Sequence, residues 1–217
     1  MQSTETVFRT VLLVDDHPFM RHAYRTVLER AADLNVVGEA DTGEHAVRAF
    51  SALAPAVVVM DLRMPGIGGL EAIRRIRERE PRARILACSV QEDAFYVGQA
   101  LQAGAQGYLN KGSPPSLLLD ALRALLAGER FVDPATALRI ERQANRGVRS
   151  PVAALSIREF EIFLLLASGE TVKEIAQRLS LSGKTIANYT TDIKTKLQLK
   201  SVAEMARLAI RCNLLEP

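Results

Sequence analysis

The sequence has only two cysteines among its 217 residues, and it lacks any long uninterrupted apolar segment. Cys88 lies in an apolar, strand-like run and Cys212 near the end of a helical pattern, so both are expected to be packed thiols and neither a disulfide nor a metal pair. No apolar run approaches the roughly 18 residues that indicate a membrane-spanning helix. The opening segment MQSTETVFRT has neither the basic start nor the apolar stretch of a secretion signal, so we expect a cytoplasmic protein without a membrane partner. An apolar fraction of 48% and a charged fraction of 24% exclude a disordered chain.

The net charge is also small, because the 28 Lys and Arg exceed the 25 Asp and Glu by only three. The charge is unevenly distributed: residues 1–127 carry 14 basic and 15 acidic side chains, whereas residues 128–217 carry 14 and 10. Between Arg178 and Lys200, five basic residues accompany a single acid, Asp192. This local excess is a modest indication of nucleic-acid binding, although a solvated helix face could carry the same charges.

Short apolar runs alternate with helical patterns over the first two-thirds of the chain. Runs of strand type occur at 10–14, 36–37, 56–60, 85–88 and 107–109. Helical spacing of apolar residues follows each run, up to about residue 30 and near 43–53, 69–79, 93–103 and 115–127. This alternation predicts an α/β domain with a five-stranded, parallel, doubly wound sheet of the flavodoxin-like type, covered by helices on both faces. In such sheets, ligands bind at the carboxyl ends of the strands.

The last third of the chain contains only helical patterns. Residues 128–152 have scattered Gly and Pro, a basic bias and at most one short helix over 135–144, so they are interpreted as a linker. Capping-box starts, with Ser or Thr three residues before Glu, follow at Ser156, Thr171 and Ser201. With Ser182 as a fourth N-cap, these signals predict a small all-α domain. Its four helices are expected near 156–168, 171–179, 182–197 and 201–211.

Three carboxylates stand at strand ends of the predicted sheet. Asp15 and Asp16 end the first strand, and Asp61 ends the third. If these ends are neighbours, like charges so close together raise one another's pKa unless a cation neutralises them. Mg²⁺ is the natural partner, because it accepts one or two carboxylates and leaves room for a phosphoryl oxygen. The fourth strand ends in the hydroxyl of Ser89 and the fifth is followed by the ammonium of Lys111, so the set suits in-line phosphoryl transfer to a carboxylate.

Each of these residues also has a plain structural explanation. A lone Asp at such a place commonly caps a helix or opens a turn, and a lone Lys or Ser is commonly a surface or strand-end residue. Their joint occurrence at four strand ends favours the phospho-acceptor interpretation. His17 has no partner histidine at ligand spacing and is interpreted as non-catalytic.

Over roughly residues 8–127, the chain resembles the receiver domain of two-component response regulators. Three segments carry the resemblance, VDDHP at 14–18, MDLRMPG at 60–66 and YLNK at 108–111. The resemblance implies that Asp61 is the phospho-acceptor. As ligands of Mg²⁺ it implies Asp15, Asp16, Asp61 and the backbone carbonyl of Arg63.

The same resemblance implies roles for three further residues. Ser89 would contact the incoming phosphoryl group, and Lys111 would bridge to it. Tyr108 occupies the position of an aromatic switch, expected to turn inward once Ser89 is drawn toward the phosphate. A sensor histidine kinase would supply the phosphoryl group. The protein would be a regulator and not an enzyme, promoting only its own phosphotransfer and dephosphorylation at Asp61.

The third helix of the tail has two unlike faces. Ile186, Ile193 and Leu197 share an apolar face. The opposite face carries Lys184, Asn188, Thr191 and Thr195. A short helix and a turn precede it, as in a helix-turn-helix unit whose second helix enters the major groove. There, Asn and Lys can read base edges, Thr methyls can contact thymine, and Lys194, Lys196 and Lys200 are placed for phosphates. A plain four-helix packing unit with a solvated polar face would show the same pattern.

Residues 155–214 resemble a LuxR-type DNA-binding domain, through the segments LSIRE, KEIA, KTIANY and KL. The resemblance adds Thr185 to the DNA-contacting residues, and a receiver followed by this module is the arrangement of the NarL/FixJ subfamily. Three positions depart from the pattern: Gly183 where an acidic residue or proline is common, Tyr189 where histidine is common, and the exposed Asp192. Gly183 weakens the helix start, and Asp192 repels phosphates unless it accepts from a cytosine amino group. These departures affect which operator is bound.

Together, the observations predict a receiver domain over 1–127, a linker over 128–152 and a DNA-binding domain over 153–217. The expected partners are a sensor histidine kinase and double-stranded promoter DNA, bound as a homodimer because two weak half-site contacts then combine. One alternative is an adaptor whose tail helices dock a protein. Another is an aspartyl-phosphate phosphatase resembling the haloacid dehalogenases, which carry a second Asp two residues after the first, whereas Asp15 and Asp16 are adjacent.

Overall fold

The computed structural model describes residues 9–90, 94–145, 151–212 and 214–215. The chain divides into two compact units, one of residues 1–90 with 100–135 and the other of residues 91–99 with 136–217. Most of the opening segment, and residues 146–150 of the expected linker, lie outside the described residues. Among the helices that the structure describes, none is both long and apolar enough to cross a membrane.

The first unit is built on a parallel sheet with the strand order β2-β1-β3-β4-β5-β6. Its strands are β1 (Arg9–Val14), β2 (Leu34–Ala40), β3 (Val57–Asp61), β4 (Ile85–Ser89), β5 (Gly107–Asn110) and β6 (Phe131–Val132). The first five strands match the sequence expectation and follow the flavodoxin-like order 2-1-3-4-5. Strand order reverses at β1, which pairs with β3 in a register that ends with Val14 opposite Met60. The carboxyl ends of β1 and β3 are therefore adjacent.

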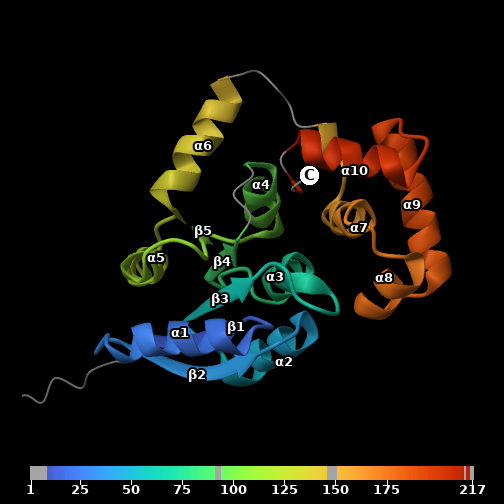
Figure 1. Ribbon diagram of the computed structural model, residues 1–217. Helices are drawn as coiled ribbons and strands as arrows, with labels where there is room; N and C mark the ends of the chain where they lie inside the picture. The colour runs from blue at the N-terminus through green and yellow to red at the C-terminus, as the bar shows by residue number, and fades with distance from the viewer. Residues whose placement is uncertain (1–8, 91–93, 146–150, 213, 216–217) are drawn as a thin grey trace, which may run out of the picture. The chain divides into compact units, whose positions relative to one another are not determined.

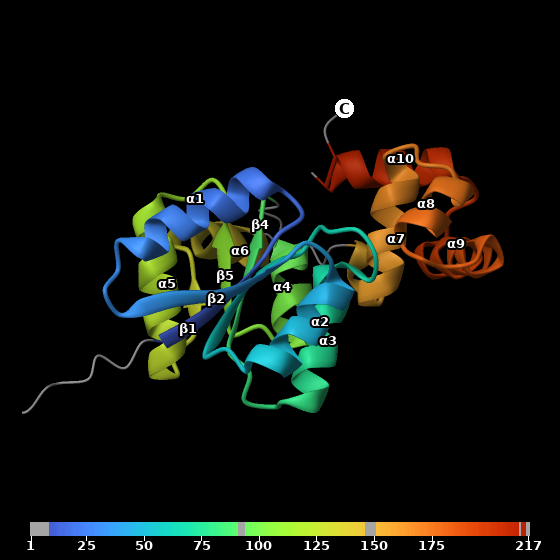
Figure 2. The ribbon, with the colours of Figure 1, turned by 90° about the horizontal axis from the view of Figure 1, so that it is seen from below.

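Helices cover both faces of this sheet. They include α1 (Pro18–Glu29), α2 (Gly43–Leu53), α3 (Gly68–Arg79) and α5 (Pro115–Ala127), while α4 (Ala94–Ala103) spans the division between the two units. Figure 1 labels each of them, and Figure 2 shows α1 and α5 on one side of the sheet with α2 and α3 on the other. Every residue of β3 and β4 is buried. Burial on both faces explains why these strands read as continuous apolar runs without polar alternation.

The segment after α5 contains more regular structure than the sequence indicated. β6 extends the sheet by pairing in parallel with β5, which makes six strands where five were expected. Helix α6 spans Pro134–Asn145, close to the expected 135–144. A strand of two residues is too short to show an apolar period, so the pattern could not reveal it. The chain thus leaves the sheet through an edge strand next to β5.

The second unit contains the helices expected from the sequence for the tail, which follow a short 3-10 turn. Its elements include η1 (Pro151–Ala154), α7 (Ile157–Ala167), α8 (Val172–Arg178), α9 (Gly183–Leu197) and α10 (Val202–Arg211). The N-caps are those expected, Ser156, Thr171, Ser182 and Ser201. The boxes at α7 and α8 are complete, whereas Glu204 of α10 accepts from the N–H of Lys200 at 2.6 Å. Four satisfied caps explain where these helices begin.

The core of the second unit fixes which side of α9 faces outward. Phe160, Phe163 and Met205 are completely buried, and the two phenyl rings stack with centroids 6.3 Å apart. Ile186 and Ile193 of α9 are also completely buried. The apolar face of α9 therefore packs inward, as its spacing predicted, and its polar face is left for solvent or a ligand.

The two cysteines behave as expected from their apolar surroundings. Cys88 is buried in β4 and Cys212 is half-buried after α10, and both remain thiols. Burial raises the pKa of the Cys88 thiol to about 12. At neutral pH it is therefore a protonated, unreactive packing residue.

Candidate functional site

The adjacent ends of β1 and β3 bring two buried carboxylates together. Asp15 follows β1 and is 1% exposed, and Asp61 is the last residue of β3 and is 2% exposed. The ammonium Nζ of Lys111 lies 2.6 Å from Asp15 Oδ2 and 2.8 Å from Asp61 Oδ2. Three residues that the sequence placed at separate strand ends thus meet in one pocket. Within it, a single ammonium is shared by two buried carboxylates.

The charge in this pocket is only partly balanced. Burial raises the pKa of Asp61 to about 6, because the favourable effect of Lys111 is smaller than the loss of hydration. Burial alone would lower the pKa of Lys111, but the two carboxylates outweigh it and raise that pKa above its ordinary value. Lys111 is therefore protonated at neutral pH, and negative charge remains on the carboxylates. A second cation would stabilise the ionised form of Asp61.

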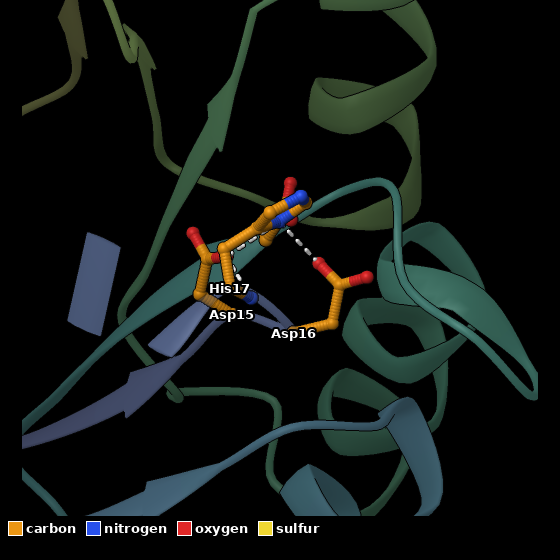
Figure 3. Close-up of side chains that lie close together, drawn as sticks. Asp15, Asp16 and His17 are labelled. Carbon is orange, nitrogen blue, oxygen red and sulfur yellow. Dashed lines mark hydrogen bonds and ion pairs between the residues drawn. The ribbon is translucent and has the colours of Figure 1, made fainter. Parts of the chain in front are cut away.

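The acidic groups form a set suited to a hard divalent cation. Ligand atoms of Asp15, Asp16, His17 and Asp61 all lie within 4.8 Å of one another. Figure 3 shows the imidazole of His17 over the two adjacent carboxylates, with its Nδ1 2.8 Å from Asp16 Oδ1 and 3.4 Å from Asp15 Oδ1. Mg²⁺ prefers such oxygen ligands and keeps some of its waters, for which the half-buried side chain of Asp16 leaves access. The residues present fit this ion.

His17 was set aside from the sequence because it has no histidine partner. The structure places it beside the carboxylates, with its side chain 69% exposed. Its backbone N–H donates to Asp15 Oδ1 at 2.9 Å. Direct adjacency to Asp16 in the sequence was the one signal that could have pointed to this position.

The other expected pocket residues lie within the strands or just after them. The backbone N–H of Arg63 donates to Asp61 Oδ1 at 3.1 Å. Ser89 is buried at the end of β4, and its carbonyl accepts from the N–H of Lys111 at 2.9 Å. Tyr108 in β5 is completely buried. Its ring already lies inward in this structure, where an inward turn on activation was the expectation.

The loop between β3 and α3 is held by a residue that the sequence did not single out. Glu44 in α2 accepts from the backbone N–H of Ile67 through Oε1 at 3.1 Å.

A glycine near the start of α3 allows a close backbone approach to the pocket. A Cβ on Gly69 would lie 1.9 Å from the carbonyl oxygen of Asp61. Glycine at this position is what lets the start of α3 pack directly against the backbone of Asp61.

In the second unit, α9 presents the polar face that the sequence predicted. Exposed on the helix are Lys184, Asn188, Thr191, Asp192, Thr195 and Lys196. Thr185 and Lys194 are half-buried, and Lys200 is exposed just beyond the helix. The hydroxyls of Thr191 and Thr195 donate to backbone carbonyls one turn earlier, at 3.1 and 3.0 Å. Because these hydroxyl groups already donate within the helix, their methyl groups are the parts better placed to contact thymine.

One expected phosphate contact already has a partner within the protein. Lys196 Nζ lies 2.7 Å from Oε2 of the buried Glu159. The same carboxylate oxygen accepts from the backbone N–H of Ser156 at 2.8 Å, so the pair joins the end of α9 to the start of α7. Part of the charge of Lys196 is neutralised there, which leaves Lys194 and Lys200 as the stronger of the three candidates for phosphate contacts.

Two family models match the chain, one over each half. The model described as the response regulator receiver domain covers residues 11–123, and that of the bacterial regulatory proteins of the luxR family covers residues 153–209. The chain therefore belongs to the two-component response regulators that join a receiver to a LuxR-type helix-turn-helix domain, the NarL/FixJ arrangement. Its fold, strand order and acidic pocket agree with that membership.

Similar proteins span nearly the same length. The transcriptional activator protein ExaE of Pseudomonas putida is 40% identical over 208 residues, covering 94% of this chain and 97% of ExaE. The response regulator UvrY of Escherichia coli strain K12 is 39% identical, covering 94% and 95%. A solved structure of RcsB from Salmonella enterica serovar Typhimurium, bound to a promoter with a phosphomimetic, has 28% identity and a TM-score of 0.71 over 92% of this chain and 97% of that one. The names of the first two describe regulators, which supports a non-enzymatic role.

Proposed function

We propose that a sensor histidine kinase phosphorylates Asp61 and that the phosphorylated chain binds promoter DNA and regulates transcription. The observation that carries the first half is the convergence of Asp15, Asp61 and Lys111 in one buried pocket. Buried charges are costly unless they are paired, so a fold that keeps two carboxylates on one ammonium supports a role for the charge itself. Family membership supports both halves.

In the proposed reaction, a carboxylate oxygen of Asp61 attacks the phosphorus of a phosphohistidine. The bond from phosphorus to the histidine nitrogen breaks, and that nitrogen keeps the electron pair and takes up a proton. Lys111 stabilises the charge on the phosphoryl oxygens, and the hydroxyl of Ser89 donates to one of them. Mg²⁺, when bound, neutralises the same oxygens. Its proposed ligands are Asp15, Asp16, Asp61 and the backbone carbonyl of Arg63.

For the output, we propose a receiver over 1–127, a linker over 128–152 and a DNA-binding domain over 153–217. The side chains proposed to contact DNA are Lys184, Thr185, Asn188, Thr191, Lys194, Thr195, Lys196 and Lys200. Binding as a homodimer would let two half-site contacts combine, and Tyr108 with the surface around α4 and α5 is proposed to carry the signal. A protein that binds promoter DNA and receives phosphate from this kinase is proposed to be cytoplasmic.

Transfer of phosphate from acetyl phosphate tests the pocket directly. The full chain is incubated with acetyl phosphate and Mg²⁺, and the acyl phosphate is counted by intact-mass spectrometry. The wild type is expected to take up one phosphoryl group, and Asp61→Asn none, because an amide is a very poor nucleophile. Asp41→Asn is a matched control, since Asp41 directly follows the neighbouring strand β2 but its side chain is 63% exposed. Full labelling of Asp61→Asn would overturn the assignment.

A further inference from the structure

Arg21 in α1 reaches the backbone of the loop that carries Asp15 and Asp16. Its Nη1 donates to the carbonyl oxygen of Asp15 at 2.6 Å. Its Nε donates to Oε2 of Glu39, in β2, at 2.9 Å. The side chain of Arg21 is only 18% exposed, so both contacts are shielded from bulk water. One planar guanidinium therefore ties the loop after β1 to the neighbouring strand.

Glu39 is a firm anchor for this contact. Arg25, one turn further along α1, donates to Glu39 Oε1 from Nε at 2.9 Å and from Nη2 at 2.6 Å. The hydrogen bonds from Arg25, and then those from Arg21, hold the pKa of Glu39 below its usual range against the opposing effect of burial. Glu39 is therefore ionised at neutral pH. Arg25 shares this anchor with Arg21, and within the described part of the chain the guanidinium of Arg25 hydrogen-bonds Glu39 and not Asp15.

The carbonyl that Arg21 holds belongs to the peptide group joining Asp15 to Asp16. A peptide group is planar, so fixing its carbonyl also fixes the direction in which Asp16 leaves the loop. The N–H of Asp15 donates to the carbonyl of Ala40 at 3.0 Å, and its Oδ1 accepts from the N–H of His17 at 2.9 Å. Arg21 adds the contact on the Asp16 side of the residue. The backbone from which the two adjacent carboxylates project is thus held on both sides of Asp15.

We propose that Arg21 is a positioning residue for the cation of this pocket. By holding the Asp15–Asp16 peptide, it keeps both carboxylates oriented toward a common ligand. This inference rests on the proposed function, because the cation is the one proposed to support phosphorylation of Asp61. The direction in which cation affinity changes when Arg21 is removed distinguishes two explanations. If the positive charge of Arg21 acted only by repulsion, removing it would tighten cation binding, whereas loss of positioning weakens it.

Calorimetric titration of the full chain with Mg²⁺ tests this role. Arg21→Ala is expected to raise the dissociation constant about tenfold, equivalent to about 1.4 kcal/mol. Arg25→Ala is the matched control, because it also loses a contact to Glu39, and its dissociation constant is expected to stay within about twofold of wild type. Arg21→Lys keeps the charge but cannot make both contacts of the planar fork, so an intermediate value is expected.

Acetyl phosphate labelling at varied Mg²⁺ provides the second readout. The half-saturating Mg²⁺ concentration should rise in Arg21→Ala, while the rate at saturating Mg²⁺ stays within about twofold of wild type. Unchanged or tighter Mg²⁺ binding in Arg21→Ala, or an equal loss in Arg25→Ala, would overturn the positioning role. If wild type itself neither binds Mg²⁺ nor accepts phosphate, the proposed function fails as well. If wild type is labelled but Arg21→Ala has the same Mg²⁺ dependence as wild type, only the positioning role of Arg21 is contradicted and the proposed function stands.

Discussion

The pocket after β3 and the polar face of α9 differ in how their side chains are presented. In the pocket, Asp15, Asp61 and Lys111 come from three separate loops and strand ends, and the two carboxylates are almost completely buried. On α9, residues such as Asn188 and Thr191 share one helix and are exposed. The pocket groups pair with one another inside the protein, whereas the polar groups on the outer face of α9 are exposed to solvent and accessible to a partner.

This contrast predicts different responses to mutation. A buried group in a water-excluded site has strong electrostatic interactions, so its removal should change the reaction by orders of magnitude. An exposed side chain on a helix contributes one contact among several, so its removal should change affinity by a smaller factor. The predictions below test that difference, in order of decreasing expected effect.

Loss of the pocket ammonium should have the largest effect. Lys111→Ala leaves Asp15 and Asp61 without their shared cation and removes the charge that stabilises the phosphoryl oxygens. The rate of labelling by acetyl phosphate at saturating Mg²⁺ is expected to fall about a hundredfold, as when one donor to a developing anion is removed. Mg²⁺ binding should persist, because the carboxylates remain. A labelling rate within a few-fold of wild type would erase the contrast with α9.

A single exposed contact on α9 should have a smaller, sequence-dependent effect. The DNA for this test is a genomic fragment recovered by its binding to the wild-type protein. Asn188→Ala is expected to weaken binding to that fragment by about tenfold, within the roughly 1–3 kcal/mol of one base contact, and to leave binding to unrelated DNA unchanged. Lys200→Ala should weaken binding to both DNAs and reduce the steepness of log affinity against log salt concentration by about 1. Fluorescence anisotropy across ionic strength measures both. Salt-independent binding, or an equal loss on both DNAs in Asn188→Ala, would contradict base reading by this face.

The smallest effects are expected on stability, where two similar capping residues can be compared. Glu159 and Glu174 both close capping boxes, but only Glu159 is buried and paired with Lys196. Glu159→Gln should lower the free energy of unfolding in urea at about pH 7 by about 1–2 kcal/mol. Glu174→Gln should lower it by clearly less than Glu159→Gln does, because the carboxylate of Glu174 is exposed to solvent.

The effect of Glu159 should also depend on pH. Burial acts to raise its pKa, but the contacts from Lys196 and Ser156 outweigh burial and hold that pKa below its usual range. A group with a lowered folded-state pKa stabilises the fold above its unfolded pKa, and this contribution is lost as the pH falls through the folded value. The difference between wild type and Glu159→Gln should therefore shrink below about pH 4. A constant difference would show that the ion pair contributes nothing.

The sequence predicted those site residues whose position follows from topology. Asp15, Asp61, Ser89 and Lys111 each occur at or just after a strand end, and parallel strands necessarily gather those ends at one edge. The four N-caps were likewise predictable, because a capping signal acts within one turn. Local patterns were therefore sufficient for the first five strands of the sheet, the tail helices and the centre of the pocket.

Contacts between distant side chains could not be predicted in the same way. Arg21 reaches the Asp15 carbonyl and Glu39 across two elements, and Lys196 meets Glu159 from 37 residues away. Both depend on rotamers and helix orientation, which no periodic pattern encodes. The edge strand β6 was missed because two residues carry no period. These are also the features that refine the sequence-based account, by adding a positioning residue and by giving Lys196 an internal partner.

The most direct test joins the two regions by measuring whether phosphorylation of Asp61 changes DNA binding. Fluorescence anisotropy with a recovered genomic fragment would be recorded for wild type and Asp61→Asn, each with and without acetyl phosphate and Mg²⁺. Wild type is expected to bind at least about fivefold more tightly after phosphorylation, the lower range of typical allosteric coupling, and Asp61→Asn should not change. Equal tightening in both proteins, or none in fully labelled wild type, would contradict a switch operated through Asp61.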